Sequence, residues 1–285
     1  MLKDWCSKIG CMIKGVFGDV KVTHNVEENV ATTAVNASSV DEEEKTEKDL
    51  APIVKEEKLD PISIKIYKPI YEHAHGRKFG DDQPKWIVVH YTACIGLSAK
   101  SMCKVMKSNT GASSHFYIDE HDIYQGVPLK YVAWHVAGGK VNQPKKDKEM
   151  SLEQLATYKA DDWRYDLAAK NHIEWRKEDD DFKGNYYSLG VDLCVKKKKK
   201  NDKNKATDLD WYFEDDAVDN AAKTVAYLAK TYNIKLDHII RHADATGKLC
   251  PQPFAWPPEK GDKKWNDFKN KVAEYMKHEI NAKCV

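Results

Sequence analysis

The sequence predicts an α/β fold in which helices flank a central mixed β-sheet. Short apolar runs at 86–90, 189–195 and 238–242 have the length and composition of strands in a sheet. Segments with apolar residues at helical spacing alternate with these runs, and a pattern typical of a β-hairpin lies between the first two. Strands that alternate with helices, together with a hairpin, indicate a mixed sheet with helices on its faces.

The first half of the predicted domain contains a strand, a helix and a hairpin. WIVVH at 86–90 is a continuous apolar run, which is typical of a central strand buried on both faces. Ser98 has the character of an N-cap, and apolar residues follow it at helical spacing. The segments 115–119 and 123–127 flank a polar turn and predict the hairpin.

The second half repeats the alternation of strand and helix. LGVDLCV at 189–195 predicts a second buried strand, and the five lysines at 196–200 are interpreted as a solvated loop. The acids at 214–216 predict the first turn of an amphipathic helix. HIIRH at 238–242 predicts a short final strand, and residues 265–280 predict a closing helix.

Composition excludes several classes of protein. The 46 basic and 45 acidic side chains leave a net charge of +1, so we expect no general attraction to nucleic acid. No stretch approaches the roughly 18–20 apolar residues of a transmembrane helix. Charges interrupt the apolar part of residues 1–20, so we expect no cleavable signal peptide. The seven cysteines are irregularly spread, which indicates thiols made in a reducing compartment.

Residues 1–60 are predicted to form an acidic tail outside the domain core. Residues 21–60 contain no aromatic side chain, and nine acids stand against four lysines in 41–60. Such a composition buries too little apolar surface to offset the entropy of ordering. The simplest interpretation is a solvated spacer, and the alternative is an arm that attaches the protein to a virion or assembly partner.

Three separated residues form a candidate metal site. His242 and Cys250 lie eight residues apart across a glycine-containing turn, a spacing that suits zinc ligands but also a surface histidine and a buried structural cysteine. His90 favours the metal site, because it ends a predicted strand at the sheet rim, where α/β proteins place their sites. Two histidines and one cysteine leave a fourth position for water, which is the pattern of catalytic zinc.

Five sequence blocks occur in a characteristic order. They are IVVHYTA (87–93), GASSHFYIDEHDIYQGVP (111–128), AWHVAGG (133–139), SLGVDLCV (188–195) and IIRHADATGKLCPQPF (239–254). In this order they resemble the blocks of the type 2 N-acetylmuramoyl-L-alanine amidases, zinc enzymes that include many phage endolysins and share their fold with peptidoglycan-recognition proteins. The resemblance covers roughly residues 62–275. It implies that fold, Zn²⁺ as cofactor and bacterial peptidoglycan as partner.

The resemblance also implies residue roles. The positions that match the zinc ligands are His90, His242 and Cys250. Lys248 matches the lysine beside the metal, and Asp192 falls where many members carry a glutamate, the candidate general base. Ser114 falls where some phage members carry a tyrosine in that role. The candidate substrate contacts are Ser114, His115, Trp134 and His135, with a purely structural role as the alternative for both histidines.

The resemblance sets the expected domain boundaries. Residues 61–285 are predicted to form the zinc amidase domain, with an insertion at about 141–185 between AWHVAGG and SLGVDLCV. The aromatic residues of the insertion are interpreted as surface decoration or, alternatively, as platforms for sugars or the peptide stem.

The leading functional hypothesis is an amidase that cleaves the bond between the lactyl group of N-acetylmuramic acid and L-alanine. We expect a phage endolysin or virion-associated lysin, made in the bacterial host cytoplasm and acting on the cell wall after release. The alternative is a module of the same fold that binds peptidoglycan with weak or no catalysis. The complete set of three metal ligands and Lys248 favours the enzyme, because binding-only relatives typically lose the cysteine.

Overall fold

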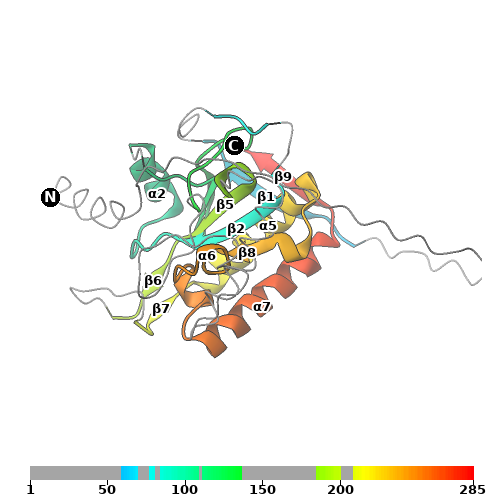
Figure 1. The fold of residues 1–285 in the computed structure, drawn as a ribbon. Helices are drawn as coiled ribbons and strands as arrows, with labels where there is room; N and C mark the ends of the chain where they lie inside the picture. Colours follow the sequence, from blue (N-terminus) through cyan, green and yellow to red (C-terminus); the bar gives the residue numbers. More distant parts are fainter. Residues whose placement is uncertain (1–58, 70–76, 81–83, 109–110, 137–183, 200–207) are drawn as a thin grey trace, which may run out of the picture. The chain divides into compact units, whose positions relative to one another are not determined.

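The computed structural model describes residues 59–69, 77–80, 84–108, 111–136, 184–199 and 208–285. Residues Leu59–Val285 form one compact unit, whose sheet and helices are shown in Figure 1. The predicted tail at 1–60 and the predicted insertion at about 141–185 lie almost entirely outside the described residues, so both stay predictions. Among the described helices, none has the length and apolar character needed to cross a membrane.

Seven strands form one mixed sheet in the order β8-β2-β5-β3-β4-β1-β9. Their bounds are β1 Ile62–Tyr67, β2 Trp86–Tyr91, β3 Phe116–Ile118, β4 Ile123–Gln125, β5 Ser188–Leu193, β8 Ile239–Arg241 and β9 Ile280–Cys284. Neighbouring strands are parallel except β3 and β4, which pair antiparallel as a hairpin. The predicted fold class, the predicted strands and the predicted hairpin are therefore confirmed.

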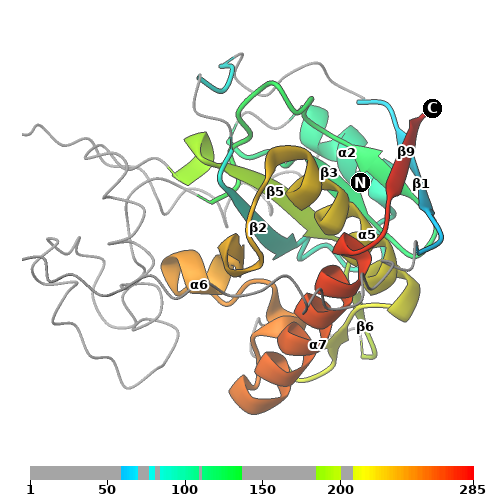
Figure 2. The ribbon, with the colours of Figure 1, turned by 90° about the vertical axis from the view of Figure 1, so that its right-hand side faces the viewer.

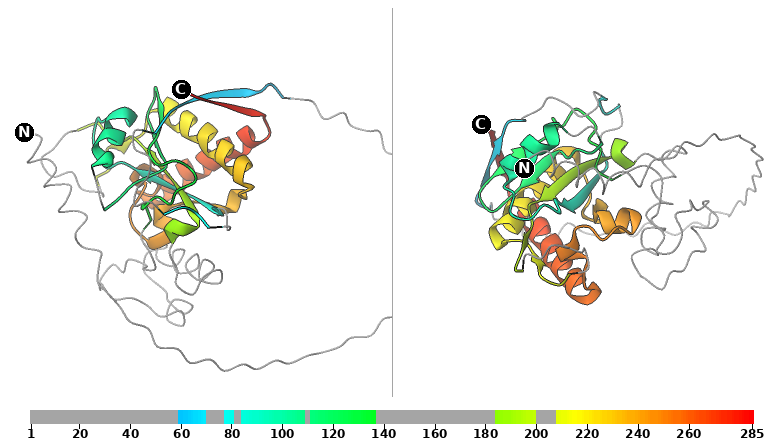
Figure 3. Two further views of the ribbon diagram at one scale, coloured as in Figure 1. Left: turned by 90° about the horizontal axis from the view of Figure 1, so that it is seen from above. Right: turned by 90° about the vertical axis from the view of Figure 1, so that its left-hand side faces the viewer.

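The helices cover both faces of this sheet. The α-helices are α2 Ala99–Lys107, α5 Asp215–Tyr232, α6 His242–Thr246 and α7 Pro258–Met276, and the 3₁₀ turns are Gly184–Tyr186, Leu236–His238 and Gln252–Phe254. Residues of α5 and α7 pack in one core cluster with Ile87, Val89 and Val191. Helix α2 packs with Tyr117 in a second cluster. Figure 3 shows α5 and α7 together on one side and α2 on the other.

The alternation of side chains along the strands decides which residues share the site face. Ile87 and Val89 of β2 face α5 and α7, so His90 lies on the opposite face. Strand β5 pairs with β2 in parallel, and Asp192 lies opposite His90 in the register. Because registered neighbours project to the same side of a sheet, these two predicted site residues share one face.

Local sequence signals explain how the predicted helices begin and end. The Ser98 side chain accepts a hydrogen bond of 3.3 Å from the Ser101 backbone N–H, which confirms the predicted N-cap. Helix α5 begins with acids in its first turn, as predicted, and ends at Asn233 in the left-handed region, with φ of 53°. Helix α7 begins at Pro258, seven residues before the predicted start, because proline suits the first turn of a helix.

Two regions differ from the sequence predictions. The lysine run does not begin as a solvated loop, because Lys196–Lys197 form β6 and pair with β7, Trp211–Tyr212. The Lys197 side chain is buried, with its ammonium 2.6 Å from Asp208 and 3.4 Å from Asp210. Strand β9 was not predicted. It pairs with β1 along its whole length, and Figure 2 shows the two strands side by side.

Candidate metal centre

His90 and His242 come together at the ends of two neighbouring strands. His90 is the fifth residue of β2, which is buried between β5 and β8. His242 directly follows β8 and is the first residue of α6. Since β2 and β8 are parallel, their carboxyl ends meet at the same edge of the sheet, and both imidazoles reach one point there.

Cys250 reaches the same point through a tight return of the chain. Helix α6 ends at Gly247, whose φ of 77° lies in the left-handed region that glycine adopts without strain. The Ala243 backbone N–H then donates to the Cys250 carbonyl over 2.7 Å. The eight-residue spacing between His242 and Cys250 is therefore one short helix and one turn, which places Cys250 beside the first turn of α6.

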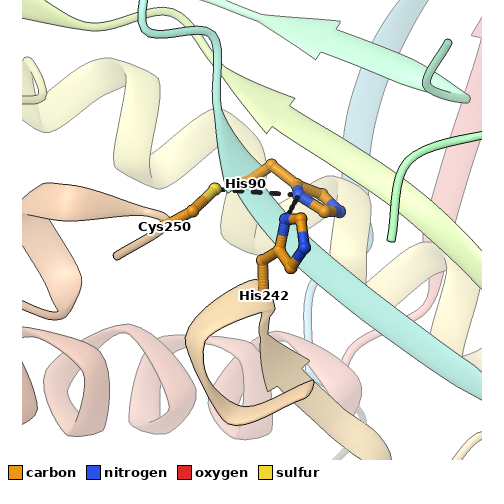
Figure 4. Close-up of side chains that lie close together, drawn as sticks. All are labelled: His90, His242 and Cys250. Atoms are coloured by element: carbon orange, nitrogen blue, oxygen red, sulfur yellow. Dashed lines mark hydrogen bonds between the residues drawn. The ribbon is translucent and has the colours of Figure 1, made fainter. Parts of the chain in front are cut away.

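Three potential ligand atoms converge at this point (Figure 4). The atoms His90 Nδ1, His242 Nδ1 and Cys250 Sγ all lie within 4.8 Å of one another. The two Nδ1 atoms are 3.0 Å apart, and the sulfur is 3.7 Å from His90 Nδ1. All three residues are buried, with 4%, 6% and 3% of their surface exposed. The structure thus brings together the three residues that the sequence predicted as metal ligands.

These distances and donor types fit a tetrahedral zinc ion. Zinc bonds of ~2.0–2.1 Å to nitrogen and ~2.3 Å to sulfur place two nitrogens about 3.3 Å apart and a nitrogen and a sulfur about 3.6 Å apart. The observed separations of 3.0 and 3.7 Å are close to these values. Among the described residues, no other group of three metal-binding side chains converges in this way.

Burial sets the protonation of the three ligands. Burial lowers the pKa of His90 and of His242 well below the ordinary range of histidine. The charge of His242 lowers the pKa of His90 further, and the charge of Lys248 lowers the pKa of His242 further. Burial also raises the pKa of the Cys250 thiol to about 12, although Lys248 and a backbone hydrogen bond from Tyr91 act in the opposite direction. Neutral imidazoles are ready ligands, whereas the thiolate needs a bound cation to be stable.

Asp192 and Ser114 lie beside this cluster. Asp192 is the partner of His90 on β5 and of Tyr117 on β3. Burial raises the pKa of its carboxyl group to about 7, while Ser114 and Lys248 oppose the rise. The Ser114 hydroxyl lies close enough to lower the pKa of this carboxyl group. Its oxygen is buried and has no hydrogen-bond partner of regular geometry among the described residues. A carboxyl group that titrates near neutral pH suits proton transfer.

Lys248 supplies the positive charge of the site. Its residue is exposed, and it follows Gly247 in the turn between α6 and Cys250. Its ammonium lowers the pKa of both candidate histidine ligands, of Cys250 and of Asp192. The charge therefore lies within electrostatic range of the three candidate ligands and of Asp192.

His135 contacts the cluster directly, which the sequence did not indicate. Its Nδ1 lies 2.9 Å from Nε2 of His90, and its Nε2 lies 3.3 Å from the Ser188 carbonyl oxygen. The backbone N–H groups of His135 and Val136 both donate to Oδ1 of Asn185. Burial lowers the pKa of His135 to about 3, with the neighbouring His115 adding to the effect.

The other predicted substrate contacts have different surroundings. His115 is fully buried, accepts a hydrogen bond from the Gly190 backbone N–H at Nδ1 and donates from Nε2 to the Tyr131 carbonyl oxygen, both over 2.9 Å. Both ring nitrogens are used within the protein, so the structure does not support a substrate contact at His115. Ser114 is also fully buried, and Trp134 is partly buried. Substrate contact at Trp134 stays a prediction.

An ion-pair network around the buried Arg241 was not predicted from the sequence. Arg241 donates to both carboxylate oxygens of Asp244, to Asp262 and to the Phe254 carbonyl oxygen. Its guanidinium lies 5.6 Å from the centre of the Trp265 ring. The network holds the first turn of α6, and with it His242, against α7. The sequence offers one signal, an arginine directly before the candidate ligand His242. The acidic partners of Arg241 could not be identified from it, because one of them, Asp262, lies 21 residues away.

The chain is similar in sequence to known proteins. The family described as N-acetylmuramoyl-L-alanine amidase matches residues 80–253. A probable N-acetylmuramoyl-L-alanine amidase of Bacillus licheniformis is 28% identical over 177 residues, covering 60% of this chain and 37% of that protein. The amidase BlyA of Bacillus subtilis (strain 168) is 25% identical over 194 residues, covering 67% and 42%. The chain thus spans about two fifths of the length of these curated relatives.

Solved structures were also found to be similar. A mutant endolysin from Bacillus subtilis is 23% identical with a TM-score of 0.43, covering 75% of this chain and 99% of that chain. The Staphylococcus aureus hydrolase AmiA, solved with its ligand, is 15% identical with a TM-score of 0.44, covering 76% and 83%. The family match spans more than half of the 285 residues and includes all three candidate ligands. The chain therefore belongs to the N-acetylmuramoyl-L-alanine amidase family.

Proposed function

We propose that this protein is a zinc-dependent amidase that hydrolyses the amide bond between the lactyl group of N-acetylmuramic acid and L-alanine in bacterial peptidoglycan. The observation that carries the proposal is the convergence of three buried ligand atoms within 4.8 Å. A carboxyl group and an ammonium act on the same cluster. Family membership supports the choice of bond, because the family is described by that activity.

The three ligands and Asp192 have complementary roles in this mechanism. A zinc ion held by His90, His242 and Cys250 would supply Lewis acidity, which polarises the scissile carbonyl and lowers the pKa of the attacking water. Asp192, opposite His90 in the sheet, accepts a proton from that water and later delivers it to the leaving amine. In the absence of metal, burial raises its pKa to about 7, and a carboxyl group with a raised pKa takes up a proton more readily than an ordinary aspartate.

Lys248 stabilises the charge that develops during the attack. As the carbonyl carbon becomes tetrahedral, negative charge grows on its oxygen. An ammonium that already lies beside the site lowers the energy of this state. Lys248 suits this role because its charge acts on all three ligands and on Asp192, while its own residue is exposed and open to a substrate.

The products of wall digestion test the proposed bond. Purified cell walls incubated with the protein should gain N-terminal alanine and no reducing sugar, and a chelator should abolish this gain. New reducing ends would contradict the amidase proposal, and a different new N-terminus would indicate an endopeptidase. Walls that retain the zinc-loaded protein but stay intact would identify it as a peptidoglycan-binding module. The reason to test this outcome is Asp192. Its side chain is shorter by one methylene than the glutamate that the resemblance implies for many relatives.

The thiol ligand can be tested separately from the reaction. Cys250→Ser should lower zinc affinity at least tenfold, because a neutral hydroxyl is a far poorer ligand than a thiolate. Cys284→Ser is the matched control, since Cys284 is exposed on the edge strand β9. Zinc content after gel filtration and competition with a chromophoric chelator measure both variants. Equal zinc affinity in the two variants would exclude Cys250 as a ligand.

A further inference from the structure

The outer nitrogen of His90 is held by a second histidine. With its Nδ1 facing His242 and Cys250, His90 directs Nε2 towards Nδ1 of His135, 2.9 Å away. The two rings meet nearly edge to face, at an angle of 87° and with 5.0 Å between centres. His135 in turn places Nε2 at 3.3 Å from the carbonyl oxygen and from Oγ of Ser188. A chain of hydrogen bonds therefore links the metal cluster to the backbone of β5.

The two ends of this chain determine where its protons lie. The Ser188 carbonyl oxygen only accepts, so His135 carries its proton on Nε2 and offers a lone pair at Nδ1. That lone pair accepts the proton of His90 Nε2, which leaves the His90 Nδ1 lone pair facing His242 and Cys250. We propose that His135 is a positioning residue, which fixes the tautomer and ring orientation that His90 needs in order to bind metal. The inference rests on the metal site of the proposed function.

The surroundings of His135 are built to hold it in this place. Two consecutive backbone N–H groups, those of His135 and Val136, donate to Oδ1 of Asn185 over 3.0 and 2.9 Å. On the other side, β5 passes so close that a Cβ atom at Gly190 would lie 2.6 Å from Cγ of His135. The absence of a side chain at Gly190 thus makes room for the ring. Asn185 therefore holds the backbone at His135, and the close approach of β5 restricts the position of the ring.

His115 shows that proximity alone does not give this role. Its ring centre lies 6.0 Å from that of His135, but its nitrogens bond to the backbone of Gly190 and Tyr131. His115 therefore stabilises the local fold, whereas His135 connects the fold to a candidate ligand. Partners that orient a ligand in this way typically change metal affinity by about 10- to 100-fold when they are removed.

Nitrogen NMR of the zinc-loaded protein tests the proposed tautomers directly. Long-range ¹H–¹⁵N correlation of the histidine rings should show His135 protonated at Nε2 and free at Nδ1, and His90 protonated at Nε2. This measurement needs no substitution, so it does not depend on the folding of a variant. A proton on Nδ1 of His135 would overturn the inference.

Two substitutions at His135 distinguish the effect of the acceptor atom Nδ1 on zinc affinity from the effect of the shape of the ring. His135→Phe keeps a ring but removes the acceptor, and it should lower zinc affinity by about 10- to 100-fold. His135→Asn places its Oδ1 near the position of the lost Nδ1, and it should restore affinity to within a few-fold of the unmodified protein. The exposed His121 gives the control variant His121→Asn, which should bind zinc normally. Thermal melting of the zinc-free forms verifies that each variant folds.

The outcomes distinguish this inference from the proposed function. If the unmodified protein binds no zinc, both are overturned. If it binds zinc and His135→Phe binds equally well, with the same absorption spectrum when loaded with Co²⁺, only the role of His135 is overturned. Equal losses in the folded Phe and Asn variants would show that an acceptor atom at this position does not restore zinc binding, and would also overturn it. Loss in the Phe variant with recovery in the Asn variant supports it.

Discussion

The positive charge of Lys248 acts on all three candidate ligands and on Asp192. We expect Lys248→Met to keep zinc and to lose turnover by on the order of 100-fold, because the charge on the carbonyl oxygen is no longer balanced. Lys260→Met, on the exposed side of α7, is the matched control. Release of amino groups from saturating cell walls measures turnover. An unchanged rate with Lys248→Met would assign oxyanion stabilisation to another group.

Asp192 links the site to the pH dependence of stability. Burial raises its pKa to about 7, whereas an aspartate in the unfolded chain titrates near about 3.9. Between these values the folded protein binds the proton and the unfolded chain does not. The protonated carboxyl group therefore stabilises the fold at low pH, and this contribution is lost as the pH rises towards about 7.

Asp192→Asn isolates this effect, because an amide does not titrate in this range. In the zinc-free protein, the free energy of unfolding of the unmodified chain relative to the variant should fall between about pH 4 and about pH 7. The expected change is on the order of a few kcal/mol. Urea unfolding of both proteins at a series of pH values measures it, and the buried histidines cancel in the difference. Parallel pH profiles would show that the pKa of Asp192 is the same in the folded and the unfolded chain, and would contradict the raised value.

Among the secondary-structure elements, those with strong local signals were predicted from the sequence. β2 is a continuous apolar run, and Ser98 caps α2 as its position indicated. β9 was missed because its sequence, INAKC, is polar and partly exposed, and it forms by pairing with β1 from the other end of the domain. β6 was missed because two lysines belong in a sheet only where Asp208 and Asp210 compensate the buried Lys197.

The junction between α6 and α7 depends on Arg241 and its two acidic partners. The Asp244 side chain is 5% exposed, and that of Asp262 is 43% exposed. Asp244→Asn leaves a buried guanidinium with a weaker partner, so we expect a loss of about 3 kcal/mol in the free energy of unfolding. Asp262→Asn should cost less than about 1 kcal/mol, because water screens that pair. Urea unfolding with unchanged m-values measures both, and equal losses would contradict the unequal roles.

The candidate site assembles from segments that lie far apart in the sequence. His90, Asp192 and His242 could be placed together because each lies at or near the end of a strand in one sheet. The link from His90 to His135 could not be predicted in this way. It depends on where the chain runs after β4 and on Asn185, 50 residues further along. Strand periodicity locates ligands, whereas the contacts that orient them require the folded chain.

We expect residues 1–58 to be dispensable for the activity of the domain. Leu59–Val285 form the compact unit that contains β1 and every residue of the candidate site. The unit is closed near its start, because His278 bonds to the Asp60 carbonyl oxygen and Ile62 to that of Glu279. A chain that begins at Leu59 keeps both bonds, so it should fold, bind zinc and hydrolyse walls at a rate within about twofold of the full chain. Thermal melting, zinc titration and release of N-terminal alanine test this expectation. An insoluble or inactive truncated protein would show that residues 1–58 are part of the catalytic unit.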